Sequence, residues 1–351
     1  MKILFTGGGS AGHVTPNIAL IEHFQQVGWD IVYVGSRAGI ERELITSVPY
    51  HAISSGKLRR YFDWQNFTDP FLILWGFLQS LVICLRERPD VVFSKGGFVT
   101  VPIAYAAWLW RIPVICHESD VTPGLANKLC FPVVQKICIN FPETARYIKN
   151  ADKTVVTGTP IRSSILNGSR QAACDAFGLS ADRATLLVFG GSLGAAAINQ
   201  MVRASLVKLL ESFQVIHVVG AGNISDISTP GYVQCEFLLD EFGDVLALAD
   251  VVVARAGANS IYELLVARKP HILIPLTSAA SRGDQLDNAK TFSAAGYSRM
   301  LDEKDGEALV DLVLQVHRDR QEIVHRIEEF PVIDSVAVIA ELLSLTAERR
   351  T

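Results

Sequence analysis

The strongest constraint on the fold is a pattern that occurs twice, in which a short buried strand runs into a glycine-rich turn and then a helix. Residues 3–16 read ILFTGGGSAGHVTP, and residues 185–195 read TLLVFGGSLGA. Such strand–helix alternation is typical of a parallel sheet with helices on both faces. Because 351 residues exceed a comfortable single core, the repeat predicts two doubly wound, Rossmann-like α/β domains.

Further strand-like runs follow each glycine turn, with amphipathic segments between them. They lie at 30–35, 90–94, 113–116 and 136–139 in the first half, and at 214–219, 233–237, 250–254 and 271–275 in the second. We place the domain boundary near TGTPIR, residues 157–162. Ligands of such sheets bind at the carboxyl ends of the strands, so we expect the two glycine turns to face one cleft that receives two substrates.

The first turn contains a literal G-x-G-x-x-G in Gly7, Gly9 and Gly12, which raises the alternative of a nicotinamide dinucleotide site. Such a site has an Asp or Glu at the end of the second strand that binds the ribose. That strand instead ends in Gly35-Ser36-Arg37, although Arg37 could meet a 2′-phosphate. Since His13 stands where a dinucleotide motif would continue its helix, we favour a loop that presents this histidine to a substrate.

The helix after this turn has ordinary start and stop signals. We expect Thr15 to cap it, Pro16 to occupy its first turn and Gly28 to end it.

Composition excludes several classes of protein. A net charge of −4 offers no general attraction to nucleic acid. The six cysteines form no C-x-x-C, which favours reduced thiols over a disulfide or metal framework. No H-x-x-x-H with a carboxylate partner and no D-x-D at a strand end is present, so we expect no metal site.

The lengths of the apolar segments argue against a signal peptide and against a membrane-spanning helix. The apolar start, Ile3–Phe5, is shorter than the ~7–15 apolar residues of a signal peptide. The longest apolar run, FLILWGFLQSLVICL at 71–85, is interrupted by polar residues and falls short of the ~20 residues that span a bilayer. We therefore expect a soluble chain.

Seven motifs in one order resemble a bacterial enzyme family that adds N-acetylglucosamine to the lipid-linked muramoyl-pentapeptide precursor of peptidoglycan. They are GGGSAGHVTP, SKGGFVTVP (94–102), HESDVTPGLANK (117–128), TGTPIR, FGGSLGA (189–195), RAGANSIYE (255–263) and RGDQLDNA (282–289). The spellings HESD and RGDQ resemble the Gram-positive form of the family. The resemblance implies a GT-B fold. Residues 1–160 would then form an acceptor and membrane-facing domain, residues 161–334 a UDP-sugar domain, and a helix at about 335–351 would pack back on the first domain.

Inverting glycosyl transfer needs a base for the acceptor hydroxyl. His13 is our candidate, because the positive end of a helix favours a neutral imidazole. Glu118 and Asp120 lie on a second loop expected at the same cleft, and either could orient or replace the histidine. Ser10 and Asn127 are expected to line that cleft on the acceptor side.

For the donor, the backbone N–H groups around Gly191 at a helix start suit phosphate oxygens. The resemblance assigns Ser192 and Arg162 to the diphosphate and Glu263 to the ribose, where a carboxylate can accept two hydroxyl hydrogen bonds. Sugar contacts are expected from Asp284 and Gln285, of which Gln285 is the safer assignment because some relatives carry Gln where this chain has Asp284. Leu239 and the turn at Ala258 complete the predicted donor site, with no cofactor.

The acceptor implied by the resemblance is undecaprenyl-linked muramoyl-pentapeptide, so we expect a peripheral enzyme on the cytoplasmic face of the membrane. Anionic lipid would meet the aromatic and aliphatic side chains of 67–85 and 108–111, together with Lys57, Arg59, Arg60 and Arg111. Other cell-wall enzymes are further candidate partners. The simpler alternative is that 71–85 is an ordinary buried helix.

Three other functions stay open on the sequence. The chain could be a glycosyltransferase for another lipid acceptor such as diacylglycerol, a sugar-nucleotide epimerase, or a sensor that binds UDP-N-acetylglucosamine without turnover.

Overall fold

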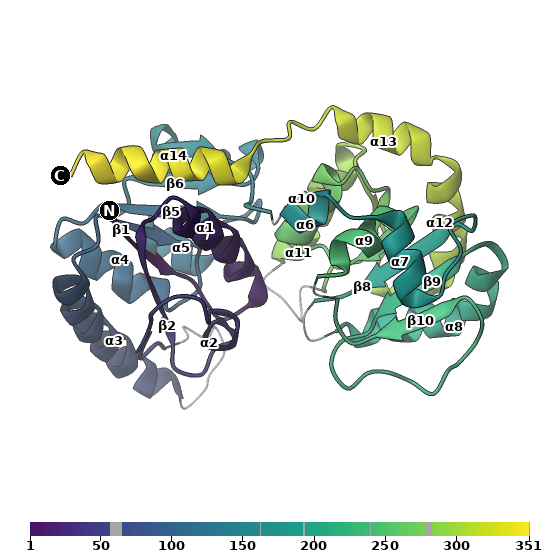
Figure 1. Cartoon of the computed structure of the whole chain (residues 1–351), viewed down its shortest axis with the longest axis horizontal. Coiled ribbons are helices and arrows are strands. Elements are labelled where there is room, and N and C mark those ends of the chain that lie inside the picture. The colour runs from purple at the N-terminus through teal and green to yellow at the C-terminus, as the bar shows by residue number, and fades with distance from the viewer. Residues whose placement is uncertain (57–64, 162, 192–193, 239, 278–282, 351) are drawn as a thin grey trace. The chain divides into compact units, whose positions relative to one another are not determined.

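Two compact units make up the chain in the computed structural model, which describes residues 1–56, 65–161, 163–191, 194–238, 240–277 and 283–350 (Figure 1). Unit 1 comprises residues 1–161 and 333–351, and unit 2 comprises residues 162–332. Each unit contains one fully parallel sheet with helices packed on it. The predicted fold class, with two Rossmann-like α/β domains, is confirmed.

Unit 1 has a seven-stranded sheet in the order β3-β2-β1-β4-β5-β6-β7. Its strands are β1 (Lys2–Thr6), β2 (Asp30–Ser36), β3 (Tyr50–Ile53), β4 (Val91–Ser94), β5 (Val114–Glu118), β6 (Lys136–Ile139) and β7 (Thr154–Val156). Its helices are α1 (Thr15–Gln26), α2 (Ile40–Leu44), α3 (Gln65–Glu87), α4 (Thr100–Leu109), α5 (Leu125–Cys130) and α14 (Ser335–Glu348), with 3₁₀ turns η1 (Ala11–His13), η2 (Pro142–Tyr147) and η3 (Ala151–Lys153).

The core of unit 1 lies on both faces of this sheet, because successive residues of a strand point to opposite sides. Ile3 and Phe5 pack with α1 and α14, whereas Leu4 packs with α3 and α4. All three side chains are fully buried. Strands that are apolar on both faces are what a parallel sheet covered by helices requires.

The chain returns to unit 1 at its C-terminal end through α14. Asp334 caps this helix by accepting a hydrogen bond of 3.0 Å from the Ala337 amide. Ile339 and Leu343 are fully buried in the same cluster as Phe5 and Phe24. The last helix is therefore part of the unit 1 core.

Unit 2 has a six-stranded sheet in the order β10-β9-β8-β11-β12-β13. Its strands are β8 (Thr185–Phe189), β9 (Gln214–Val218), β10 (Tyr232–Cys235), β11 (Val251–Ala254), β12 (His271–Leu273) and β13 (Arg299–Met300). Its helices are α6 (Ser163–Leu166), α7 (Arg170–Phe177), α8 (Ala196–Ser212), α9 (Phe242–Leu248), α10 (Ala258–Val266), α11 (Asp284–Ala294), α12 (Leu309–Arg318) and α13 (Arg320–Glu328), with the 3₁₀ turn η4 (Glu303–Ala308).

Two local predictions were wrong. Thr15 is not a cap but the first residue of α1, and its hydroxyl donates to the Ala11 carbonyl at 3.0 Å because η1 already leads into the helix. The length of the apolar run at 71–85 also underestimates the apolar segment. It belongs to the 23-residue helix α3, in which Asp69–Glu87 is long and apolar enough to cross a membrane by length and composition.

Candidate functional site

The glycine turn of unit 1 lies where the sheet changes direction. Strand β1 has β2 on one side and β4 on the other, so the loops that follow β1 and β4 start side by side. The Gly8 amide donates to the Gly96 carbonyl at 3.2 Å, which joins these two loops. Such a switch point is the usual ligand site of an open α/β sheet.

The two loops can approach so closely because glycines, which have no side chain, stand where they meet. Gly97 has a left-handed φ of +88°, and a Cβ on it would overlap the backbone of Gly8. The Tyr33 hydroxyl donates to the Gly7 carbonyl at 2.8 Å and holds the turn from below. The loop is therefore a fixed backbone surface.

His13 occupies the end of η1, with Val14 between it and α1, and is half-buried. Its Nδ1 lies 2.8 Å from the Gly8 carbonyl oxygen, with the Ser10 hydroxyl at 3.2 Å. A carbonyl can only accept, so the proton of the neutral ring is on Nδ1 and the lone pair is on Nε2. This is the tautomer that a general base needs.

Glu41, which was not predicted as a site residue, holds the same turn. Its side chain is fully buried. One carboxylate oxygen accepts from the Ser36 amide at 2.9 Å and the Ser36 hydroxyl at 2.6 Å, and the other accepts from the Gly9 amide at 3.1 Å. Burial raises the pKa of Glu41, but these hydrogen bonds outweigh it and hold the pKa below its ordinary value. A dinucleotide site would have a carboxylate at the end of β2 that binds the ribose. Here the carboxylate comes five residues later, at Glu41, and binds the chain's own glycine turn at Gly9.

Glu118 ends β5 and is almost completely buried. Its carboxylate accepts three hydrogen bonds, from the amides of Asp120 at 3.0 Å and Gly124 at 2.9 Å and from the Asn127 side chain at 2.9 Å. Asn127 also donates to the His117 carbonyl at 3.0 Å. This arrangement orders the loop from 119 to 124 and joins it to the start of α5, and it favours His13 over Glu118 as the base. Catalytic roles for Glu118 and Asp120 stay predictions.

A buried lysine, Lys95, joins the loop after β4 to the loop after β5. Lys95 follows β4 and donates to His117 Nδ1 at 2.9 Å and to the Ser119 hydroxyl. His117 in turn donates from Nε2 to the Gly158 carbonyl at 2.7 Å. Burial lowers the pKa of Lys95 to about 8, although Glu118 and Asp120 act in the opposite direction. Burial and the Lys95 charge hold the pKa of His117 well below its ordinary value, so its ring is neutral.

Three adjacent strands of unit 2, β8, β11 and β12, carry the predicted donor residues at or after their carboxyl ends. Gly191 follows β8, and its carbonyl accepts from the Gly194 amide at 2.8 Å in the turn that precedes α8. Ala258 begins α10 after β11, and Glu263 lies one and a half turns further, half-buried. The switch point of this sheet lies between β8 and β11.

Asp284 and Gln285 open α11, which follows β12. The Gln285 side-chain oxygen accepts from the Leu276 amide at 3.1 Å and so joins the helix start to the strand end. The buried Arg255 supports the same edge, because its guanidinium donates to the Ile274 carbonyl at 3.1 Å and pairs with Glu303 at 2.6 Å. The structure therefore brings five of the predicted donor residues to one edge of this sheet.

Arg162, Ser192 and Leu239, together with Lys57, Arg59 and Arg60, lie outside the described residues. Within the described ranges, no group of three His, Cys, Asp or Glu side chains is placed to hold a metal ion. The expected independence from metal stays a prediction. All six cysteines are unpaired, and five of them are buried.

Two models of one protein family match this chain. Residues 3–139 match the glycosyltransferase family 28 N-terminal domain, and residues 185–342 match the family 28 C-terminal domain.

Curated relatives match over the full length. A protein of Legionella pneumophila (strain Paris) is 46% identical over 100% of this chain and 98% of its own length. One from Clostridium kluyveri is 47% identical over 97% and 98%, and one from Geobacillus kaustophilus is 47% identical over 99% of both chains. Each is named UDP-N-acetylglucosamine–N-acetylmuramyl-(pentapeptide) pyrophosphoryl-undecaprenol N-acetylglucosamine transferase. These identities are too similar to assign the chain to one bacterial group.

Solved structures share the fold. Acinetobacter baumannii MurG has a TM-score of 0.75 at 21% identity over 98% of this chain and 99% of its own. The UDP-GlcNAc 2-epimerase from Neisseria meningitidis has a TM-score of 0.70 at 13% identity over 98% and 100%. The fold alone therefore does not separate a transferase from an epimerase.

Proposed function

The chain belongs to glycosyltransferase family 28, and from this premise we propose that it moves N-acetylglucosamine from UDP-N-acetylglucosamine to undecaprenyl-diphospho-muramoyl-pentapeptide. The substrates follow from the names of relatives that are 46–47% identical over essentially the whole chain. The structural observation that carries the chemistry is the Nδ1–H of His13 on the Gly8 carbonyl, which leaves the basic nitrogen, Nε2, on the other side of the ring.

In the proposed reaction, His13 Nε2 takes the proton of the muramoyl 4-hydroxyl while that oxygen attacks the anomeric carbon of the donor. The bond from the anomeric carbon to the UDP oxygen breaks, the configuration inverts, and UDP leaves with its additional negative charge. Hydrogen-bond donors already in place stabilise such developing charge most effectively. The turn after β8 and Arg162 are proposed for that task, Glu263 for the ribose, and Gln285 for the sugar.

A turnover assay with UDP-N-acetylglucosamine and a synthetic lipid-linked muramoyl-pentapeptide tests this function. We expect transfer with release of UDP, and we expect His13→Ala to lower kcat by ~10²–10⁴-fold with UDP affinity little changed. Formation of UDP-N-acetylmannosamine without any acceptor would identify an epimerase. Binding of the donor without turnover would identify a sensor. Turnover of His13→Ala within a few-fold of the unmodified enzyme would move the base to Glu118 or Asp120.

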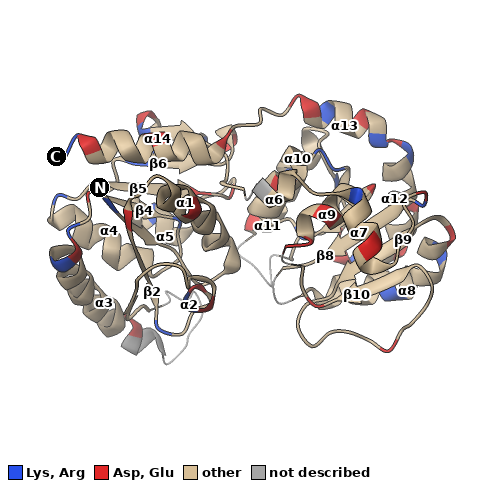
Figure 2. Cartoon of the chain, viewed as in Figure 1, with Lys and Arg blue, Asp and Glu red and all other residues tan. Residues whose placement is uncertain are grey.

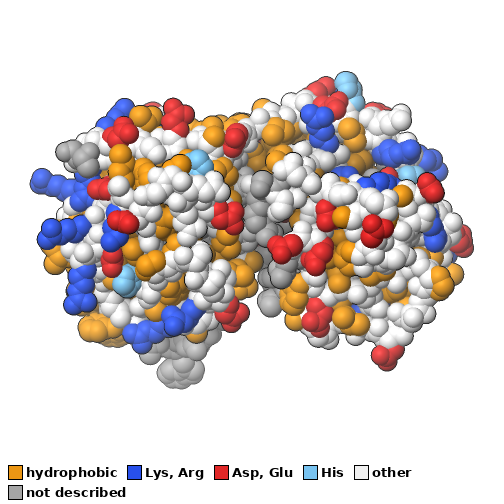
Figure 3. Space-filling view, viewed as in Figure 1, with side chains coloured by type: hydrophobic (Ala, Val, Ile, Leu, Met, Phe, Trp, Pro, Cys, Tyr) orange, Lys and Arg blue, Asp and Glu red, His pale blue; other side chains and the backbone are white. Residues whose placement is uncertain are grey.

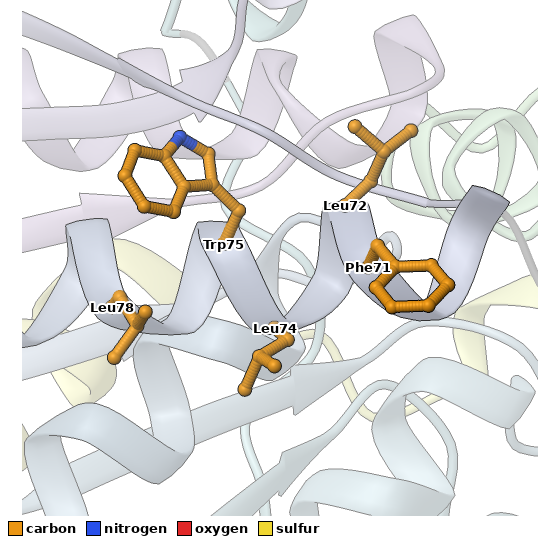
Figure 4. Close-up of a pocket in the computed structure, with 5 residues that line it drawn as sticks. All are labelled: Phe71, Leu72, Leu74, Trp75 and Leu78. Carbon is orange, nitrogen blue, oxygen red and sulfur yellow. The ribbon is translucent and has the colours of Figure 1, made fainter.

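We further propose that unit 1 docks on the cytoplasmic face of the membrane through the outer face of α3. Side chains on this face recur at helical spacing and are exposed, as in Phe71 at 74% and Trp75 at 55% exposure. Five of them, Phe71, Leu72, Leu74, Trp75 and Leu78, line a shallow apolar hollow of about 510 Å³ (Figure 4). No charged residue lies between 71 and 85 (Figure 2). An apolar face of this kind inserts favourably at a lipid interface.

The inner face of α3 argues for a helix that lies on the membrane rather than across it. A Cβ on Gly76 would overlap the Ser54 carbonyl oxygen, and the Gln79 side chain accepts from the Ser54 amide at 2.8 Å. The Trp110 indole donates to the Leu81 carbonyl at 3.2 Å. A spanning orientation would break these contacts with the rest of unit 1.

Basic side chains flank the apolar face. Arg86, Arg88 and Arg111 are exposed, and cationic side chains gather along this edge of unit 1 (Figure 3). Each cation near an anionic surface contributes ~1 kcal/mol, which salt screens. Membrane binding is therefore expected to need both the apolar face and anionic lipid.

Co-sedimentation with vesicles containing phosphatidylglycerol tests this docking. Trp75→Ser with Leu78→Ser is expected to reduce binding strongly, and Arg86, Arg88 and Arg111 changed together to Ser are expected to reduce it more at low salt than at high salt. The matched control is Val207→Ser with Lys208→Ser, an exposed apolar–basic pair in unit 2. Equal sedimentation of all variants would refute the docking surface.

A further inference from the structure

We infer that Glu41 is a positioning residue for the base, acting on His13 through the single peptide group between Gly8 and Gly9. This inference rests on the proposed role of His13. The carbonyl of this peptide group belongs to Gly8 and accepts from His13 Nδ1 at 2.8 Å. The N–H of the same peptide group belongs to Gly9 and donates to the Glu41 carboxylate at 3.1 Å.

The order of groups is therefore imidazole, peptide, carboxylate. A negative charge on the N–H side of a peptide group strengthens the partial negative charge on its carbonyl oxygen, because hydrogen bonds in a chain polarise one another. That oxygen faces the ring nitrogen that carries the proton. When Nε2 takes a proton from the acceptor, the ring becomes a cation, and a more negative Gly8 oxygen stabilises it. Serine proteases achieve the same with a carboxylate bonded directly to the histidine.

The Glu41 carboxylate is built into this place. Glycines surround it, and a Cβ on Gly8 or Gly39 would overlap its oxygens, while a Cβ on Gly35 would lie 2.8 Å from its Cγ. Its second oxygen is held by the Ser36 amide and hydroxyl at the end of β2. A fully buried carboxylate with fixed partners cannot rotate away, so its charge stays on the Gly9 side of the peptide group.

Other titratable groups near this pair are few among the described residues. The phenols of Tyr33 and Tyr50 lie beside Glu41, and burial raises the pKa of each. Arg42 lies over the Tyr50 ring at 5.5 Å from its centroid. Lys95 approaches from β4, with its Cβ against Gly7. Both phenols stay neutral at the pH of the assay, which leaves Glu41 as the negative charge at the Gly9 amide.

Glu41→Gln is the appropriate change, since it removes the charge and keeps the size of the side chain. Its one amide oxygen can accept from the Gly9 amide or from the Ser36 amide but not from both, so the measurements must separate loss of charge from loss of a hydrogen bond. We expect kcat to fall roughly tenfold, equivalent to ~1.4 kcal/mol of transition-state stabilisation, with KM for the donor unchanged. The acidic limb of the pH profile is expected to move to lower pH, because the imidazolium is less stabilised. Glu87→Gln is the matched control, a carboxylate bonded to Lys2 and His51 on the same unit; its kcat and pH profile are expected to stay unchanged.

Two measurements separate positioning from folding. In ¹⁵N-histidine-labelled protein, the titration midpoint of the His13 ring is expected to move to lower pH in Glu41→Gln, a readout that does not depend on turnover. In the His13→Ala background, Glu41→Gln is expected to change residual turnover by less than twofold. An unmoved His13 midpoint, or the same tenfold loss with and without His13, would overturn the inference. A moved midpoint in a protein whose turnover ignores His13 would instead refute the proposed base and leave the coupling intact.

Discussion

Replacing Lys95 with methionine is expected to change how the stability of unit 1 depends on pH. Lys95 is fully buried, and burial lowers its pKa from 10.5 to about 8. Below pH 8 the lysine is protonated in both the folded and the unfolded chain, so the folded state bears the whole cost of the buried charge. Between pH 8 and 10.5 the folded chain has lost this proton while the unfolded chain keeps it, so the stability of the unmodified protein rises with pH.

The size of the effect follows from the two pKa values. One pKa unit corresponds to ~1.4 kcal/mol, so the interval from about 8 to 10.5 gives ~3 kcal/mol. His117, whose pKa depends on the Lys95 charge, is neutral above pH 7.5 in both proteins and adds nothing to this difference. The free energy of unfolding of the unmodified protein, minus that of Lys95→Met, is therefore expected to rise by ~3 kcal/mol from pH 7.5 to 10.5. At pH 7 the variant loses the hydrogen bonds to His117 and Ser119, which offsets part of its advantage.

Urea unfolding followed by tryptophan fluorescence measures this difference, because all five tryptophans lie in the segment 1–161 that unit 1 contains. Lys128→Met, at an exposed lysine of the same unit, is the control and is expected to show no such pH dependence. A difference between the unmodified protein and Lys95→Met that stays constant from pH 7.5 to 10.5 would refute the assignment of a buried, weakly basic lysine.

Four further outcomes are expected. Leu343→Ala, in the buried face of α14, should lower the unfolding free energy of unit 1 by ~2–5 kcal/mol, whereas Leu345→Ala on the exposed face should change it little; equal effects would contradict the packing of α14. Calorimetry should show that Glu263→Ala weakens UDP binding by ~1.5–3 kcal/mol, and that Gln285→Ala weakens the sugar nucleotide more than UDP; unchanged affinities would remove both from the donor site. Turnover should survive exhaustive EDTA treatment, and a strict need for Mg²⁺ would argue against the metal-free reaction. A thiol reagent should modify Cys235 first in the native protein, since the other five cysteines are buried.

Strands that are apolar and central could be predicted from the sequence, because their burial on two faces leaves a continuous apolar run, as in β1, β4, β8 and β11. The edge strands β3, β7 and β13 were missed. They have four, three and two residues, and all their side chains except that of Ile53 are only half-buried, so no hydrophobic pattern marks them.

At the candidate site, the sequence indicated which loops come together but not how their charges are arranged. His13 was predicted from its place after the glycine turn. Glu41 was missed because its role depends on α2 folding back over the end of β2, and its sequence neighbours give no sign of that. Lys95 lies within a recognised motif, yet its complete burial follows from the approach of His117 and Ser119 on another strand end.

The return of the chain to unit 1 has a consequence for synthesis on the ribosome. Unit 2 is one uninterrupted segment, residues 162–332, whereas unit 1 is assembled from 1–161 and 333–351. While all of unit 2 is translated, the apolar surface of the first segment on which Ile339 and Leu343 pack therefore stays uncovered. Unit 2 can complete its fold as soon as it emerges, but unit 1 closes only when α14 has also left the exit tunnel. Domains usually complete their folding in the order of synthesis, whereas here unit 2 is complete before unit 1. A chain that stops before α14 would expose to quality-control proteases the apolar surface that this helix covers.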